Sequence, residues 1–170
     1  MGTSGEIASG LTAEHLREMV DYDPLTGVLR WRGSAAAWRN GRVAGCYDPQ
    51  NGYVLVRLAG RLFKGHRLAW LYMTGQWPAS GIDHINGARS DNRWSNLRAA
   101  THGQNACNRG AQKNSRTGIK GVHRQAGKWR ARIKVGGRNL SLGLFSDPLS
   151  AAEAYAAAAR RYHGDFARRQ

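Results

Sequence analysis

One segment of the chain, residues 81–109, gathers the side chains best suited to hydrolytic chemistry. It reads Gly-Ile-Asp-His-Ile-Asn-Gly, then Asp-Asn-Arg and Asn-Leu-Arg, and it closes with Gln-Asn-Ala-Cys-Asn-Arg. Hydrolysis of a phosphodiester needs a base that activates water, and a histidine with an unperturbed pKa of about 6.5 suits that role. It also needs a cation that offsets the charge developing at phosphorus. Because Asp and Asn oxygens are hard ligands that suit Mg²⁺, the segment indicates metal-assisted cleavage of phosphodiester bonds.

The apolar pattern around these side chains predicts the elements that must position them. We expect a strand over residues 82–85, a polar loop over 86–96, a second strand over 97–101 and a short helix over 102–109. Such a strand–loop–strand–helix unit can bring its first strand and its helix together over one metal ion. Neighbouring strand residues point to opposite faces, so Asp83 and His84 share a site only if the strand twists or ends there.

Upstream of this segment the sequence predicts a β-rich part with two helices. The expected elements are a helix over 11–20 capped by Thr12, a turn over 22–27, a strand over 28–32, a loop over 34–42, a hairpin turn at Asn51-Gly52, strands over 53–58 and 61–64, and a helix over 66–74 that stops near Gly75. The fold class is therefore α+β.

The central blocks resemble phage-type H-N-H endonucleases, a group that includes homing endonucleases. The resemblance rests on Asp83-His84-Ile-Asn-Gly, Asp91-Asn92-Arg93, Asn96-Leu97-Arg98 and Gln104-Asn105-Ala-Cys-Asn108, with His66-Arg-Leu-Ala-Trp before them and, more weakly, the turn over 22–27. It covers roughly residues 22–109 and implies a ββα-metal (His-Me finger) core at about 81–109. It also implies a DNA endonuclease that leaves a 5′-phosphate and a 3′-hydroxyl.

The resemblance implies a role for four residues. His84 would be the general base, Asp83 a metal ligand, and Asn96 the residue that holds the loop by side-chain bonds to backbone. Asn105 lies nine residues after Asn96, where the last His of the motif falls, and would be the second metal ligand. An Asp and Asn pair favours Mg²⁺ (or Mn²⁺ or another divalent metal) over Zn²⁺.

Some of these assignments have alternatives. His84 has a purely structural reading, and His102 and Asn108 compete with Asn105 as ligand. We interpret His66 as a packed, hydrogen-bonded helix residue. Three arginines are candidates for phosphate contacts, with an ordinary basic surface as the alternative: Arg93, Arg98 and Arg109.

The C-terminal part alternates strictly between apolar and basic residues over 128–135. Trp129, Ala131, Ile133 and Val135 share one face, and Lys128, Arg130, Arg132 and Lys134 share the other. Period two predicts a strand with one buried and one solvent face. We also expect a turn at Gly136-Gly137, strands over 138–145 and 119–124, and a helix with a capping box at Ser150–Glu153 that ends at Gly164. The three strands would form an antiparallel sheet covered by this helix.

This module is similar to DNA-binding domains of the APETALA/ethylene-response-factor type over about residues 117–168. The segments that carry this resemblance are Gly121-Val-His, Lys128 to Ile133, Leu140 to Phe145 and the Ala-rich run from Ala151 to Gly164. The resemblance implies that the sheet contacts duplex DNA; the residues on the matching face are Arg130, Arg132, Lys134, Asn139 and Ser141, beside Lys128. Ser141 stands where those domains have Trp, and Arg132 where they have an acidic residue. Their base preference therefore does not transfer.

Charge supports an anionic partner. The chain has 26 basic and 11 acidic side chains, and residues 111–170 hold 13 and 3 of them, a net of +10. Nucleic acid is the partner that such an excess favours. No stretch approaches the ~20 apolar residues of a membrane-spanning helix. Two cysteines exclude a Cys-rich zinc finger and a disulfide framework, and they favour a reduced, cytoplasmic setting in a phage-infected or bacterial cell.

We therefore predict four consecutive parts: a flexible tail over 1–10, a nuclease domain over 11–110, a linker over 111–117 and a DNA-binding domain over 118–170. One such site cleaves one strand, so a monomer, the expected state, should nick DNA, whereas a dimer could cut both strands. The alternative function is a non-catalytic, sequence-specific DNA-binding regulator with a decayed nuclease core.

Overall fold

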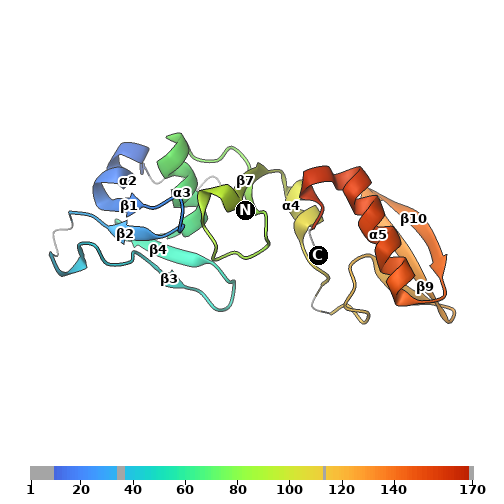
Figure 1. Cartoon of the computed structure of the whole chain (residues 1–170). Helices are drawn as coiled ribbons and strands as arrows, with labels where there is room; N and C mark the ends of the chain where they lie inside the picture. The colour runs from blue at the N-terminus through green and yellow to red at the C-terminus, as the bar shows by residue number, and fades with distance from the viewer. Residues whose placement is uncertain (1–9, 34–36, 113, 169–170) are drawn as a thin grey trace. The chain divides into compact units, whose positions relative to one another are not determined.

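The computed structural model describes residues 10–33, 37–112 and 114–168, and the tail expected over 1–10 lies outside them apart from Gly10. The chain divides into two compact units, Met1–His102 and Gly103–Gln170. Each unit combines helices with antiparallel sheets (Figure 1). In the described ranges, every helix is too short or too polar to cross a membrane.

Within its described residues, the first unit contains three small antiparallel sheets and two α-helices. Its elements are α2 (Ala13–Met19), β1 (Val20–Tyr22), β2 (Leu29–Trp31), the 3-10 helix η1 (Ala37–Arg39), β3 (Cys46–Tyr47), β4 (Val54–Leu58), β5 (Arg61–Lys64), α3 (Gly65–Thr74), β6 (Gly81–His84), the 3-10 helix η2 (Trp94–Asn96) and β7 (Leu97–Ala100). The sheets are β1-β2, β3-β4-β5 and β6-β7. The expected β-rich part of an α+β fold is confirmed.

Local chemistry explains the element boundaries. The Thr12 side chain accepts a hydrogen bond from the His15 amide and so caps α2, as predicted. Gly75, with a φ of 77°, ends α3 in the left-handed conformation that glycine tolerates. The helix expected over 11–20 ends one residue early, because Val20 pairs with Trp31 and opens β1.

The core of the first unit lies between α2, α3 and the β3-β4-β5 sheet. Helix α3 packs on α2, β4 and β5. The fully buried large side chains there are Leu16, Val20, Val56, Leu58, Leu68 and Leu71. Ile82 and Leu97 belong to the same apolar cluster. Their burial anchors the β6-β7 hairpin, which carries Asp83 and His84, on the core.

The second unit is a three-stranded antiparallel sheet with a helix across it. Its elements are β8 (Val122–Gln125), β9 (Lys128–Val135), β10 (Arg138–Phe145), α5 (Pro148–His163) and the 3-10 helix η3 (Gly164–Phe166), and the strand order is β10-β9-β8. Helix α5 packs on β9 and β10 (Figure 1). Ala131 and Ile133 are buried under it with Tyr155 and Ala158. The predicted layers, the β9 and β10 bounds and the Gly136-Gly137 turn are confirmed.

Two details of this unit differ from the prediction. The capping box at Ser150–Glu153 is wrong, because α5 begins at Pro148 and its N-cap is Asp147. The Asp147 carboxylate accepts from the Ser150 amide at 2.8 Å, and proline is well tolerated at the first helical position. The third strand spans Val122–Gln125 rather than 119–124, since its partner residues on β9 run from Ala131 to Lys128.

The linker expected at 111–117 stays a prediction, and the division between the two compact units lies earlier in the chain. It falls within α4 (His102–Asn108), after its first residue. The Lys120 ammonium donates to the carbonyls of Ala106, Cys107 and Arg109, the last at 2.6 Å. These bonds satisfy carbonyls at the end of the helix and attach it to the C-terminal module. Burial lowers the pKa of Lys120.

Candidate active site

Strand β6 carries the two residues at the centre of the predicted site. Asp83 is 3% exposed and His84 6% exposed. Strand β6 ends at His84, and its register pairs Asp83 with Arg98 and His84 with Leu97 on β7. Two polar side chains this deeply buried require specific partners, because an unpaired buried polar group is costly.

The partner of Asp83 is the arginine directly across the hairpin. Arg98 donates from Nε at 2.9 Å and from Nη2 at 2.6 Å, both to Asp83 Oδ2. Their side chains are 17% and 4% exposed, so water screens the pair weakly. Arg98 was a candidate for phosphate contact, and in the folded chain its guanidinium binds this carboxylate.

The partners of His84 come from other elements. Its Nε2 lies 3.3 Å from Asn92 Oδ1. Its ring meets the His66 ring edge-on at 4.9 Å and lies 6.3 Å from the Tyr53 ring, both centroid to centroid. Burial lowers the pKa of His84, although the Asn92 hydrogen bond and the Asp83 and Asp91 charges raise it in part. The lowered pKa favours the neutral imidazole, the form that can accept a proton.

Asn92 is the positioning residue that sequence reasoning missed. It is 3% exposed, and its backbone carbonyl accepts from the Tyr22 hydroxyl at 2.6 Å. A Cβ on Gly27 would lie 2.4 Å from the Asn92 carbonyl carbon, so a side chain there would displace the loop. The N-terminal hairpin therefore fixes the residue that contacts His84. The only sequence signal for Asn92 was its place in the Asp91-Asn92-Arg93 block.

Asn96 holds the loop between β6 and β7 by side-chain hydrogen bonds to the backbone. Its Oδ1 accepts from the Asn86 amide at 3.0 Å, and its Nδ2 donates to the Asp91 carbonyl at 2.8 Å. These are side-chain bonds to backbone of the kind predicted for this residue. Because they span both ends of the loop, they hold the chain directly after His84 in one conformation.

Asp91 and Arg93 form a second ion pair on the same loop. Arg93 donates from Nε at 2.8 Å and from Nη2 at 2.6 Å to the two oxygens of Asp91. The Arg93 hydrogen bond is the first cause that lowers the pKa of Asp91 to about 2. Arg93, like Arg98, is thus held by a carboxylate of its own chain.

His66 is packed, as predicted, but its hydrogen bonding differs from the prediction. Its exposed fraction is 6%, and its Nδ1 has no hydrogen-bond partner among the residues that the structure describes. Burial, followed by the charge of His84, lowers the pKa of His66 well below its ordinary value. Two neutral imidazoles therefore share this buried cluster.

The residues proposed as metal ligands fall in different units. Asp83 belongs to the first, whereas Asn105 lies on α4 in the second, where it is half-buried. His102 and Asn108, its alternatives, lie on the same helix, and Asn108 is 3% exposed. In the described ranges, no three His, Cys, Asp or Glu side chains gather as a metal site. A carboxylate and an amide remain a donor set that suits Mg²⁺ rather than Zn²⁺.

The outer face of the C-terminal sheet is strongly basic. Cross-strand partners share a face of a sheet. The register pairs Arg130 with Leu144, Arg132 with Ser141 and Lys134 with Asn139. Ala131 and Ile133 are buried under α5, whereas Arg132, Lys134, Asn139 and Ser141 are exposed. The structure thus places together the residues that the sequence assigned to one face, and Lys128 lies exposed at its end.

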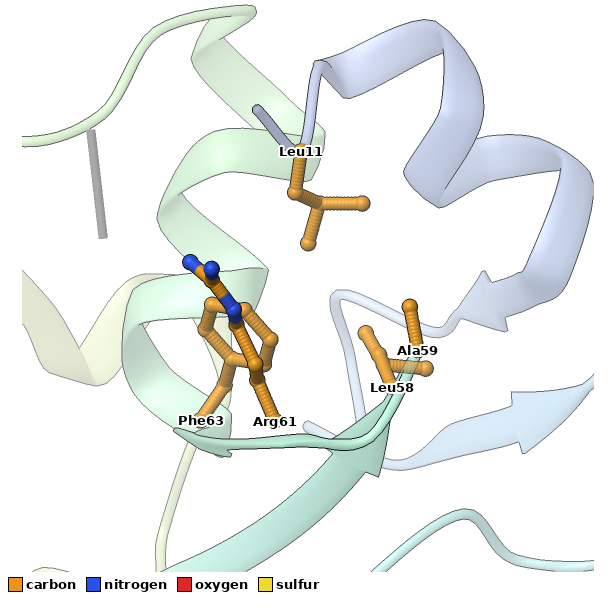
Figure 2. Close-up of a pocket in the computed structure, with 5 residues that line it drawn as sticks. All are labelled: Leu11, Leu58, Ala59, Arg61 and Phe63. Atoms are coloured by element: carbon orange, nitrogen blue, oxygen red, sulfur yellow. The ribbon is translucent and has the colours of Figure 1, made fainter. Parts of the chain in front are cut away.

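A small pocket lies elsewhere in the first unit. Its lining residues are Leu11, Leu58, Ala59, Arg61 and Phe63 (Figure 2). None of them belongs to the cluster around Asp83 and His84. Apart from Arg61 the lining is apolar, so the pocket contributes no group to hydrolysis.

A buried histidine and a buried carboxylate thus lie on one β-hairpin. The side chain of Asn96 holds the loop between its strands by hydrogen bonds to the backbone. The family model of HNH endonucleases matches residues 63–107, which include this hairpin, helix α3 and most of α4. The match supports an HNH nuclease, and nucleases of this kind act on DNA and in general depend on a divalent metal. Neither a curated protein nor a solved structure matches the chain.

Proposed function

We propose that this chain is a divalent-metal-dependent DNA endonuclease in which His84 is the general base. The observation that carries the proposal is His84 itself. It is buried, neutral and held by Asn92 at the end of β6, inside the segment that matches HNH endonucleases. A neutral imidazole in a fixed orientation can take a proton from water as that water attacks phosphorus.

The metal would be held by Asp83 and Asn105, and Mg²⁺ suits their oxygens best. When bound, such an ion offsets negative charge at the scissile phosphate and at the leaving oxygen. Arg98 would orient Asp83 through the two hydrogen bonds that it donates to Oδ2. Asn96 would hold the loop that follows His84. Attack by water at phosphorus, with departure of the 3′-oxygen, leaves a 5′-phosphate and a 3′-hydroxyl.

The C-terminal sheet would dock on duplex DNA as in APETALA-type domains. Support comes from its basic outer face, where Arg130, Arg132 and Lys134 line one strand. A sheet face of this kind fits the major groove, and its charges would contact phosphates and base edges. We propose a monomer that nicks one strand, because one such site cleaves one strand.

Nicking of supercoiled plasmid tests the proposal. Wild-type protein with Mg²⁺ should convert supercoiled DNA to open circles, and chelation by EDTA should stop the reaction. His84→Ala should lower the single-turnover rate about 10²–10⁴-fold, the usual contribution of a general base. Circular dichroism and DNA-binding affinity serve as folding controls for this variant. If a folded His84→Ala protein nicks as fast as wild type, the mechanism is wrong.

The second candidate is a DNA-binding regulator without catalysis, favoured only by the basic C-terminal face. It predicts sequence-preferring binding with no Mg²⁺-dependent nicking at any protein concentration. The retained Asp83, His84, Asn96 and Asn105 argue for the nuclease.

A further inference from the structure

Two cations lie beside the His84 cluster and take no part in the chemistry described above. The Lys64 ammonium is 4.5 Å, and the Arg89 guanidinium 5.0 Å, from the centroid of the Tyr53 ring. Both distances are within the ~6 Å over which an aromatic ring attracts a cation. The same ring lies 6.3 Å from the His84 ring and 5.1 Å from that of His66. One tyrosine therefore places two positive charges next to the proposed base.

These two cations are exposed, and the nearby carboxylates of the described residues pair with other arginines. Asp83 is paired with Arg98, and Asp91 with Arg93. Across the part of the chain that the structure describes, neither Lys64 nor Arg89 forms an ion pair with a carboxylate. This differs from Arg93 and Arg98, whose guanidinium groups are already bound.

The positions of the two cations are held by the fold. Arg89 donates to the Asn51 carbonyl at 3.0 Å, which ties the loop after β6 to the turn before β4. Lys64 is the last residue of β5 and the N-cap of α3. The Arg89 charge acts on both His66 and His84, and the Lys64 charge acts on His66. Both groups are thus electrostatically close to the histidine pair.

We propose that Lys64 and Arg89, mounted on Tyr53, form a clamp for the phosphates of the DNA strand that His84 attacks. This inference rests on the proposed function. Successive phosphates of one strand are spaced by about 3.4 Å along the helix axis. Lys64 and Arg89 contact the Tyr53 ring, which lies beside His84. They would therefore face the scissile phosphate or its neighbours. The clamp would position the strand for attack.

The test uses the full chain and two readouts, DNA affinity as a function of salt and single-turnover nicking. The variants are the double substitution Lys64→Gln/Arg89→Gln and the pair Tyr53→Phe and Tyr53→Leu. Arg57→Gln is the matched control, since Arg57 is an exposed arginine of the same unit that donates to the Gly60 carbonyl of its own turn. Thermal unfolding checks that each variant is folded.

In Lys64→Gln/Arg89→Gln, the slope of log affinity against log salt should fall by about 0.9 for each lost phosphate contact, or about 1.8 in all. Its nicking rate should fall at least tenfold, because misplaced substrate slows attack strongly. Arg57→Gln should change neither quantity. Tyr53→Phe keeps the ring and should nick faster than Tyr53→Leu, which removes the ring although its charge is unchanged.

The outcomes separate the clamp from the nuclease activity. If wild type nicks and the double variant matches Arg57→Gln in both slope and rate, the clamp is overturned and the nuclease stands. If wild type never nicks but the double variant loses the slope, the clamp stands and hydrolysis fails. Equal rates for folded Tyr53→Leu and Tyr53→Phe would overturn the role of the ring.

Discussion

Arg98 donates two hydrogen bonds to a single oxygen of Asp83, at 2.9 and 2.6 Å, across the β6-β7 hairpin. A residue expected to touch DNA is thereby the counter-charge of the proposed metal ligand. Because the ion pair is largely buried, Asp83 and Arg98 depend on each other for stability as well as for function.

The first prediction concerns this pair. Arg98→Leu should lower the free energy of unfolding by about 3–5 kcal/mol, because it removes the guanidinium that pairs with the buried Asp83 carboxylate. Urea denaturation at neutral pH measures the loss. The double variant Asp83→Leu/Arg98→Leu should recover most of it, since no uncompensated charge remains. A loss below about 1 kcal/mol in Arg98→Leu, comparable with an exposed pair, would contradict the assignment.

The second prediction concerns Asn92. Asn92→Ala removes the oxygen that lies 3.3 Å from His84 Nε2, so the imidazole loses its orientation. We expect the single-turnover nicking rate to fall about 10–10²-fold at saturating protein, with DNA affinity unchanged. Asn114→Ala, at an exposed asparagine outside the site, is the control and should keep the wild-type rate. An equal rate in the two folded variants would remove Asn92 from the positioning of the base.

The third prediction concerns pH and His66. Burial holds the pKa of folded His66 well below its ordinary value, with the charges of His84, Lys64, Arg67 and Arg89 acting in the same direction. Below about pH 6.5 the unfolded chain therefore binds a proton at His66 that the folded chain does not bind. The free energy of unfolding falls as pH drops through that range. His66→Phe should weaken this dependence by up to about 1.4 kcal/mol per pH unit.

The same substitution should also stabilise the protein by about 1 kcal/mol at pH 7, because it removes a buried Nδ1 that has no hydrogen-bond partner in the described residues. Chemical denaturation between pH 5 and pH 8, compared with wild type, measures both effects. An unchanged pH slope would mean that His66 titrates normally in the folded state.

The fourth prediction concerns the C-terminal sheet. Arg132→Gln/Lys134→Gln removes two exposed charges of its outer face. The slope of log affinity against log salt should fall by about 1.8, with weaker binding at every salt concentration. The matched control is Arg160→Gln/Arg161→Gln, which removes two exposed charges from α5 instead. Equal slopes for the two double variants would place DNA elsewhere on this unit.

Local pattern determined most of the secondary structure. The strict alternation over 128–135 defined β9 and its buried face, because period two can place every apolar residue on one side of a sheet. Turn chemistry predicted the C-terminal end of α3 at Gly75 and the Gly136-Gly137 hairpin. The start of α5 was missed because Asp147 and Ser150 compete as caps within one turn, and only the formed bond between them decides which residue is the N-cap.

The sequence by itself determined that His84, Asp83 and Asn96 lie on one polar hairpin, since these residues are neighbours along the chain. Tertiary structure alone decided their partners. Asn92 reaches His84 because Tyr22, 70 positions away, holds its backbone, and Lys120 attaches α4 to the second unit through three carbonyls. Such contacts leave no periodic trace in the sequence, because they depend on how separate elements pack and not on the residues beside them.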